Sequence, residues 1–366
     1  MGRMIRFLAV AAFLSLPAGF AGAGGIKQLK EYKAAVSHEK GSWAGRHIRG
    51  LGHYLDSLSA AGVDTSFFSL PKYGWKATVS ASFAGLLGSV RGSDIPGYGD
   101  ISGRLRTSLN GQTSVTLGYR GLSLGYSFGI ARGYSRDFNL SYMRNAWGLE
   151  YRNHLTDGLH GRMDASLTPD DLPVLKNDIR LKATIINGYY VFNSRHYSLP
   201  AAMGQTVVQK RSSGSVTAYA VFLSSSMVSR EPAVSAMLGG LNKIELYQAA
   251  LGLGYGYNFT PNRGRLLLHA SAAPLLVFFN KSLMTADVNF PLPSGGNITT
   301  EISKEVLPRH KYFVTFVARA SVAYNFGDHI FASAALLVND IDFNSTTGLK
   351  LAMHDWILRT TLGLRF

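Results

Sequence analysis

The sequence contains no cysteine, and only 16% of its residues are charged, against about 25% in ordinary soluble domains. The absence of cysteine excludes a disulfide framework, a thiolate zinc site, a cysteine nucleophile and a lipoprotein anchor. Because the apolar fraction is an ordinary 46%, Gly, Ser and Tyr take the place of the missing charge, which argues against a soluble helical protein. The 366 residues suit two or three ordinary domains or one large β-domain.

Acidic residues are also scarce, since 22 Asp and Glu stand against 37 Lys and Arg, giving a formal charge of +15. Such a charge indicates nucleic acid, an acidic membrane surface, or basic side chains inside a lumen. Residues 1–23 have the layout of a secretory signal peptide, with Arg3 and Arg6, an apolar run and an Ala-x-Ala site. Its removal takes two arginines and leaves +13. Export argues against a nucleic-acid partner.

Beyond this segment no run of 18 apolar residues occurs, so no transmembrane helix is expected. Apolar side chains instead alternate with small polar ones, most clearly over 75–83, 122–130, 312–326 and 355–366. A period of two predicts β-strands with one apolar and one polar face.

Both a soluble β-sandwich and a membrane barrel contain such strands. Three features favour the barrel: strands long enough for a bilayer crossing of about 9–11 residues, aromatic residues near strand ends, and polar faces of Gly, Ser, Thr and Arg. The chain also ends on a strand at Phe366. We therefore predict an all-β fold, an antiparallel transmembrane β-barrel over 73–366, preceded by a short, partly helical periplasmic segment over 24–72.

Twelve strands are expected, with ten or fourteen as alternatives, and both chain ends in the periplasm. The predicted strands are 73–90, 112–120, 121–131, 136–144, 146–155, 179–193, 213–228, 244–260, 264–281, 311–326, 329–342 and 347–366. The predicted outer loops are 91–111, 156–178, 229–243 and 282–310.

Residues 189–222 carry a resemblance to a known family, through Tyr190–Asn193, Tyr197–Ala202 and Gln209–Ser215. The stretches Gly121–Ser127 and Gly254–Phe259 match as well. The sequence resembles uncharacterised outer-membrane β-barrel proteins of Bacteroidetes-type bacteria, which carry a domain of unknown function. The resemblance implies a barrel in the outer membrane and no particular activity.

His269 and Ser271 are the best candidates for catalysis, because a serine hydrolase needs a hydroxyl beside a histidine base. Both face the lumen if Leu266, Leu268 and Ala270 face lipid. Residues two apart on a strand are about 6–7 Å apart, so a direct hydrogen bond is not expected without help from a neighbouring strand. Simple lumen packing is the alternative interpretation.

Basic residues on predicted lumen faces suggest an anion path, or a binding site for lipid phosphates or acidic glycans. The alternative is that they pair with carboxylates of loops or of a plug. They are Lys76, Arg180, Lys182, Arg265, Arg319, Arg359 and Arg365.

The connection 194–212 is unusually long for the periplasmic side, and is interpreted as an inward-folded plug, a docking site for a periplasmic protein, or a packed loop. Residues 26–60 have helical spacing and are a second candidate for such a partner. No phosphate-binding loop, metal-ligand cluster or nucleotide motif occurs, so no cofactor or metal is expected.

The sequence thus predicts a non-enzymatic outer-membrane barrel in contact with lipids, either a narrow or plugged channel or a surface-binding barrel for an anionic or glycan ligand. The alternative function is a hydrolase of lipids or lipid A that uses His269 and Ser271. A structural or assembly role through 26–60 and 194–212 is the third hypothesis.

Overall fold

The computed structural model of the chain describes residues 64–69, 74–95, 99–107, 110–130, 135–165, 175–229, 241–291, 297–344, 346 and 350–366. The predicted signal peptide and the stretch 26–60 lie outside these residues. The chain divides into two units, Met1–Thr65 and Ser66–Phe366, and the second contains all the described strands. Within the described ranges, no helix is long and apolar enough to cross a membrane.

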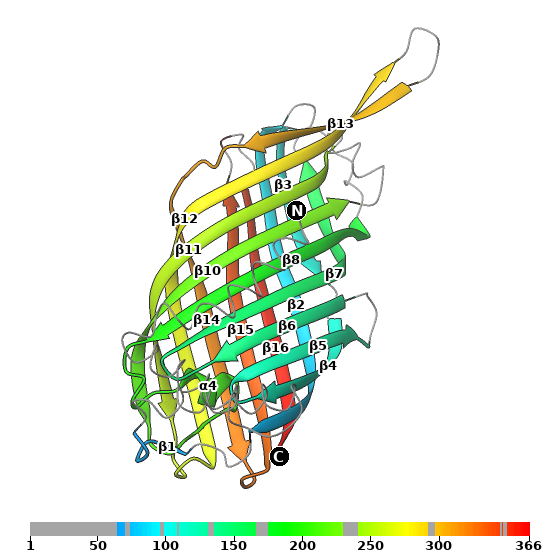
Figure 1. The fold of residues 1–366 in the computed structure, drawn as a ribbon. Coiled ribbons are helices and arrows are strands. Elements are labelled where there is room, and N and C mark those ends of the chain that lie inside the picture. The colour runs from blue at the N-terminus through cyan, green and yellow to red at the C-terminus, as the bar shows by residue number, and fades with distance from the viewer. Residues whose placement is uncertain are drawn as a thin grey trace, which may run out of the picture. The chain divides into compact units, whose positions relative to one another are not determined.

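Twelve strands form a closed wall in which each pairs antiparallel with the next, and the last pairs with the first (Figure 1). The predicted twelve-stranded antiparallel barrel is therefore confirmed. The wall strands are β2 (Trp75–Ile95), β4 (Asn110–Tyr119), β5 (Leu122–Gly129), β6 (Ser135–Met143), β7 (Trp147–Ala165), β8 (Leu175–Val191), β10 (Ser213–Ser229), β11 (Leu241–Phe259), β12 (Leu266–Pro291), β14 (Phe313–Asn325), β15 (Ile330–Asn344) and β16 (Lys350–Arg365).

The two faces of the wall have opposite character. On β2, the outward Val79 and Phe83 are 57% and 51% exposed, whereas the inward Thr78, Ser80 and Ser82 are buried. A soluble sandwich would bury the apolar face, while a membrane barrel turns it toward lipid and keeps the polar face in its lumen. The exposed apolar face thus identifies a membrane barrel.

Aromatic side chains form a rim at the end of the barrel where the connections are short. The ring pairs Trp75–Tyr119 and Tyr324–Phe326 have centroids 4.6 and 4.8 Å apart. The turn between β4 and β5 holds Arg120 and Gly121 at φ of 48° and 94°, as a tight hairpin requires. The chain terminus at Phe366 lies at this same end (Figure 1). Aromatic rims are typical of the level where a barrel leaves the hydrocarbon.

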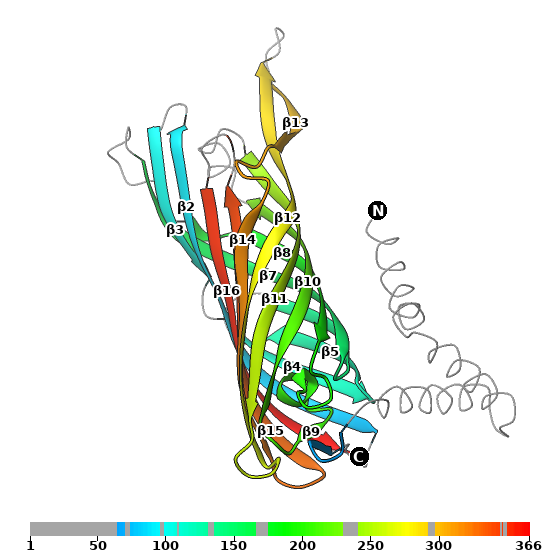
Figure 2. The same cartoon turned by 90° about the vertical axis from the view of Figure 1, so that its left-hand side faces the viewer.

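Strand structure continues into the predicted outer loops. The expected loop 91–111 contains β3 (Gly99–Thr107), which pairs with β2 and β7. The loop 282–310 is mostly a hairpin of β12 and β13 (Asn297–Val306) that extends beyond the wall (Figures 1 and 2). Residues 156–178 also add strand at both ends. These loop predictions were wrong because hairpin pairing continues past the hydrophobic belt, where apolar alternation fades.

The connection 192–212 folds into the barrel, and we call it the plug. It contains the short helix α4 (Leu199–Met203) and β9 (Val208–Gln209), which pairs with β1 (Phe68–Ser69). Ser198 caps the helix by accepting a hydrogen bond from the Ala201 amide at 3.1 Å. Tyr197 and Leu199 are fully buried. Figure 2 shows α4 among the strands, near the end of the barrel where the C-terminus lies.

Candidate functional site

Polar side chains of the inner wall hold the backbone of the plug. Asn258 on β11 donates through Nδ2 to the Ser198 carbonyl at 2.9 Å. Ser321 on β14 donates to the Ala202 carbonyl at 2.9 Å, and Lys76 on β2 donates to the carbonyl of Gly204. Arg365 on β16 donates to the next carbonyl, that of Gln205. Buried carbonyl groups need such partners, so these bonds fix the plug across the lumen.

A chamber of about 200 Å³ lies between the plug and the middle of the wall. Its floor includes Ala202–Gln205 of the plug, and many of its walls are Ser, Thr and Asn. Four cationic and two anionic side chains also line it, so the chamber carries an excess of positive charge. They are Lys76, Arg152, Arg319 and Arg359, and Asp137 and Glu150.

Arg319 on β14 is the most deeply placed of these cations, with only 6% of its surface exposed. Its Nη2 lies 3.4 Å from a Glu150 carboxylate oxygen, and its guanidinium sits 5.7 Å from the ring centroid of Tyr219. The same Glu150 oxygen accepts a hydrogen bond from Asn187 at 3.1 Å. Within the described chain, Nε and Nη1 of Arg319 are buried with no hydrogen-bond partner. Arg319 therefore has unused donors next to the chamber.

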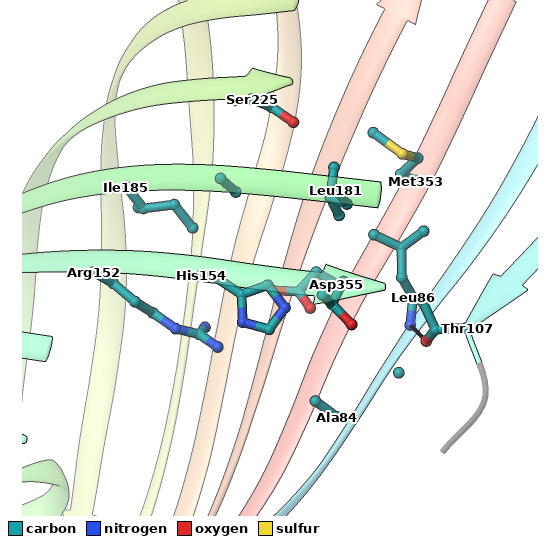
Figure 3. Close-up of a pocket in the computed structure, with 13 residues that line it drawn as sticks. Ala84, Leu86, Thr107, Arg152, His154, Leu181, Ile185, Ser225, Met353 and Asp355 are labelled. Carbon is teal, nitrogen blue, oxygen red and sulfur yellow. Dashed lines mark hydrogen bonds between the residues drawn. The ribbon is translucent and has the colours of Figure 1, made fainter. Parts of the chain in front are cut away.

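A second cluster of charged side chains, formed by Asp137, Arg152 and His154, lies at the wall of the chamber. Asp137 binds Arg152 at 3.0 Å and also pairs with Nδ1 of His154. A small pocket of about 30 Å³ lies beyond them, and it shares Arg152 with the chamber. Figure 3 shows Arg152, His154 and Asp355 in this pocket with apolar side chains such as Leu181 and Met353 around them. About 10–15 Å³ suffices for one water, so this pocket has room for only about two waters.

Arg359 on β16 faces the same chamber, and its Nε is buried without a hydrogen-bond partner among the described residues. The Nε of Arg152 is likewise buried without a hydrogen-bond partner among the described residues. Arg152, Arg319 and Arg359 thus all line the chamber, and each has at least one guanidinium N–H group without a hydrogen-bond partner among the described residues. Guanidinium groups bind phosphate and carboxylate with two hydrogen bonds at once, so this set is suited to an anionic group.

The remaining predicted lumen cations have other positions. Arg365 is 2% exposed and binds Asn325 at 3.0 Å as well as the plug, so it is structural, as is Lys76. Arg180 and Lys182 are exposed and alternate with the lumen-lining Leu181, so they face outward. The prediction for β8 was wrong because apolar residues fill the upper lumen there, which reverses the expected alternation.

Arg265 was also expected in the lumen, but it is exposed in the turn before β12, where its amide donates to the Asn262 carbonyl at 3.0 Å. The strand begins one residue later, at Leu266. The predicted boundary at 264 was therefore too early, and the lumen register does not include this residue.

His269 and Ser271 lie on the inner face of β12, and the structure joins them directly. Nε2 of His269 is 3.0 Å from Oγ of Ser271, and Nδ1 is 2.8 Å from Oδ1 of Asn258 on β11. The expectation that they were too far apart was wrong, because the histidine side chain leans along the strand and covers the distance between alternate residues. His269 is 4% exposed.

The sequence analysis did not identify the residues that partner the chamber cations, nor the partner of His269 and Ser271. Glu150, Arg152 and His154 are alternate residues of β7, and Asp137 is opposite His154 on β6. Asn258 continues the alternate series of glycines at 252, 254 and 256. The same period-two pattern that revealed the strands also places these polar residues in the lumen. Among the described residues, no group of three or more His, Asp or Glu is arranged to hold a metal.

A closed barrel with a lipid-facing apolar surface, a polar lumen and an internal plug defines a β-barrel protein of the bacterial outer membrane. A family model described as "Domain of unknown function (DUF4421)" matches residues 96–366, and the chain belongs to this family. No curated protein matches the sequence.

Solved outer-membrane barrels are similar to the chain at low identity. The outer membrane protease OmpT from Escherichia coli is 10% identical over 82% of this chain and 98% of its own, with a TM-score of 0.31. The toluene transporter TodX of P. putida is 9% identical over 80% of this chain and 90% of its own, with a TM-score of 0.26. The outer membrane protein OprG of Pseudomonas aeruginosa is 9% identical over 81% of this chain and 99% of its own, with a TM-score of 0.28. No activity is transferred from them.

Proposed function

We propose that this protein is a plugged outer-membrane barrel whose basic chamber binds the phosphate or carboxylate group of a small anionic ligand. The carrying observation is the set of buried guanidinium N–H groups of Arg152, Arg319 and Arg359 that have no partner among the described residues. Leaving a buried donor unsatisfied costs about 1–3 kcal/mol, so an anion that accepts these bonds is strongly favoured.

The dimensions of the chamber support a small ligand. A volume of about 200 Å³ exceeds the roughly 150 Å³ of a cavity that holds benzene. A phosphate ion or a single acidic sugar is of this size, whereas a polymer is not. The plug occupies the end of the lumen below the chamber, and a solute that enters from the outer end meets Arg152 and His154 first.

Binding is tested by titrating the purified protein in detergent with inorganic phosphate and with glucuronate in a calorimeter. We expect saturable binding in the wild type and at least a tenfold loss in the Arg319→Ala, Arg359→Ala double variant, because about 1.4 kcal/mol changes affinity tenfold. The matched control is Lys182→Ala, Arg265→Ala, which removes the same charge from exposed positions. Equal loss in both double variants, or no binding by the wild type to either anion, would contradict the proposal.

The plug is tested by planar-bilayer conductance. We expect the wild type to conduct weakly or not at all. Replacing residues 198–207 by a Gly/Ser linker of equal length should open a pore that prefers anions, because Arg and Lys line it. Adding Arg319→Ala and Arg359→Ala should weaken that preference, which the reversal potential measures, because two of the four lining cations are removed. A large steady conductance of the wild type would show that the plug does not close the barrel.

A further inference from the structure

A chain of hydrogen bonds joins Asn258, His269 and Ser271 on the inner wall beside the plug. Oδ1 of Asn258 is 2.8 Å from Nδ1 of His269, and Nε2 of His269 is 3.0 Å from Oγ of Ser271. Asn258 and His269 are register partners on β11 and β12, and Ser271 follows two residues along β12. A hydroxyl, an imidazole and a third polar group in this order have the arrangement of a base-activated nucleophile.

The direction of each bond follows from the partners of Asn258. Its Nδ2 donates to the Ser198 carbonyl at 2.9 Å and to Oε1 of Gln209 at 2.6 Å. Oε1 of Gln209 is an acceptor because it also receives the Ser198 amide at 3.0 Å. Oδ1 of Asn258 therefore faces His269 and accepts the proton on Nδ1. Nε2 is then unprotonated and accepts the hydroxyl proton of Ser271, which is the tautomer that a general base requires.

Two residues with unpartnered donors, Arg319 and Tyr197, are neighbours of Ser271. Arg319 is its register partner on β14, so the two side chains are neighbours on the inner face. Nε and Nη1 of Arg319 are buried without partners in the described chain, and so is the hydroxyl of Tyr197. A Cβ added to Gly256 would lie 2.2 Å from that hydroxyl and 3.2 Å from Cβ of Ser271, so the Tyr197 hydroxyl fills the position above Gly256, close to Ser271. Burial raises the pKa of Tyr197, which keeps its proton available for donation.

We propose that Ser271 is the nucleophile of an acyl-ester hydrolase site, with His269 as general base, Asn258 as its positioning residue, and Arg319 and Tyr197 as donors to the oxyanion. This inference goes beyond anion binding and does not depend on it. The substrate class is a short-chain acyl ester such as an acetylated alcohol, because the side chain of Tyr197 leaves little room for a longer acyl chain above Gly256.

The reaction needs only water as a co-reactant. Oγ of Ser271 bonds to the ester carbonyl carbon while its proton passes to Nε2 of His269, and the carbonyl oxygen becomes an oxyanion. The carbon–alkoxy bond then breaks, and His269 returns the proton to the leaving alcohol. Water attacks the acyl-serine, gives a proton to His269, and releases the carboxylic acid as Ser271 regains its proton. No electrons are transferred to or from any other group.

The site adjoins the chamber through Arg319. Arg319 lines the chamber and stands next to Ser271, which is partly exposed, whereas His269 is covered. Tyr197 belongs to the plug and its ring lies 6.2 Å from that of His269. The plug is therefore one wall of the site, and a change in the plug changes access to Ser271.

The test is labelling of the purified, folded full chain by diisopropyl fluorophosphate, followed by peptide mass spectrometry. We expect the phosphoryl adduct on Ser271 in the wild type and none in Ser271→Ala. His269→Ala and Asn258→Ala should slow labelling at least about 100-fold, because a general base contributes about 10²–10⁴ in rate. The matched control is Ser82→Ala, which removes a buried lumen serine of β2 that contacts neither the site nor the plug in any bond described above.

Hydrolysis of p-nitrophenyl acetate supplies a second measurement, with Ser271→Ala falling to the rate in buffer. Heat-modifiable migration in gels checks that every variant is folded. A folded wild type that gains no adduct at Ser271 and hydrolyses the ester no faster than Ser271→Ala would overturn the proposal. A purely structural role predicts lower stability of the variants with no adduct in any of them. Because neither measurement uses phosphate binding, failure here leaves the chamber proposal standing, and the reverse also holds.

Discussion

At the scale of single residues, the inner-wall cations fall into two groups. Lys76 and Arg365 direct their hydrogen bonds at plug carbonyls, so their charge is used to hold structure. Arg319 and Arg359 instead line the chamber, and both have N–H groups without a partner in the described chain, as does Arg365 through Nη1 outside the chamber. Because a buried unpaired donor is costly and a chamber of about 200 Å³ has room for a polar guest, the second group is the one to associate with function.

Gly256 provides a residue-scale prediction about the plug. A Cβ at this position would lie 2.2 Å from the hydroxyl of Tyr197, a residue that is fully buried. We expect Gly256→Ala to destabilise the protein by about 1–3 kcal/mol through overpacking. Urea unfolding in phospholipid vesicles measures the change, together with protease sensitivity of residues 192–212.

The control for this prediction is Gly188→Ala, since the nearest atom to its added Cβ is at an ordinary 3.8 Å. Combining Gly256→Ala with Tyr197→Phe should restore part of the lost stability, because it removes the clashing oxygen. Equal effects of the two glycine substitutions, or no rescue by Tyr197→Phe, would show that the close approach is not responsible.

At the scale of elements, the long strand β12 pairs with a different strand along each half of its length. Residues Leu266–Val277 pair with β14 in the wall, and Ser282–Pro291 pair with β13 in the projecting hairpin. The hairpin therefore adds no bond to the closed ring of twelve strands. Its pairing is local, between segments close together in the sequence.

We expect the barrel to fold with this hairpin shortened. Replacing residues 288–300 by a two-residue Asn-Gly turn retains all of the β12–β14 pairing and all of the β11–β12 pairing. The change in unfolding free energy should stay within about 0.5 kcal/mol, as for surface changes remote from the core. Loss of the heat-modifiable band would show that the hairpin is needed for closure of the wall.

The elements also show where sequence reasoning succeeds. On β2, Val79 and Phe83 alternate with Thr78 and Ser82, so lipid and lumen faces are unambiguous. On β8 the inward side chains include Leu181 and Ile185, and the apolar side no longer marks the lipid face. An alternating pattern shows which face of a strand is apolar, but not whether that face points to lipid or to the lumen. The prediction therefore fails wherever apolar side chains fill the lumen.

At the scale of the whole molecule, the barrel depends on an apolar outer surface. We expect Leu251→Arg, on the lipid face of β11 and 54% exposed, to cost about 2–4 kcal/mol of folding free energy in bilayers. Tyr257→Arg, six residues nearer the aromatic rim, should cost about 0–1 kcal/mol. Urea titration in vesicles measures both, and equal costs would contradict the assignment of this surface to lipid.

The sequence was sufficient for the architecture and insufficient for the site. Twelve strands, their antiparallel order and the polar lumen follow from alternation along the chain. Contacts between residues far apart in sequence, such as Glu150 with Arg319 or Asn258 with Ser198, depend on how the wall closes and on where the plug settles. A single sequence contains no direct signal for either, so the candidate set included His269, Ser271 and Arg319 but not their partners.

Two positive side chains face each other where the first and last strands of the barrel pair, because Lys76 on β2 and Arg365 on β16 are register partners. Opposed cations on a sheet repel each other. Both side chains instead donate to consecutive carbonyls of the plug, at Gly204 and Gln205. Closure of the wall and seating of the middle of the chain in the lumen therefore stabilise each other, because the plug carbonyls accept the bonds of the two cations that meet where the first and last strands join.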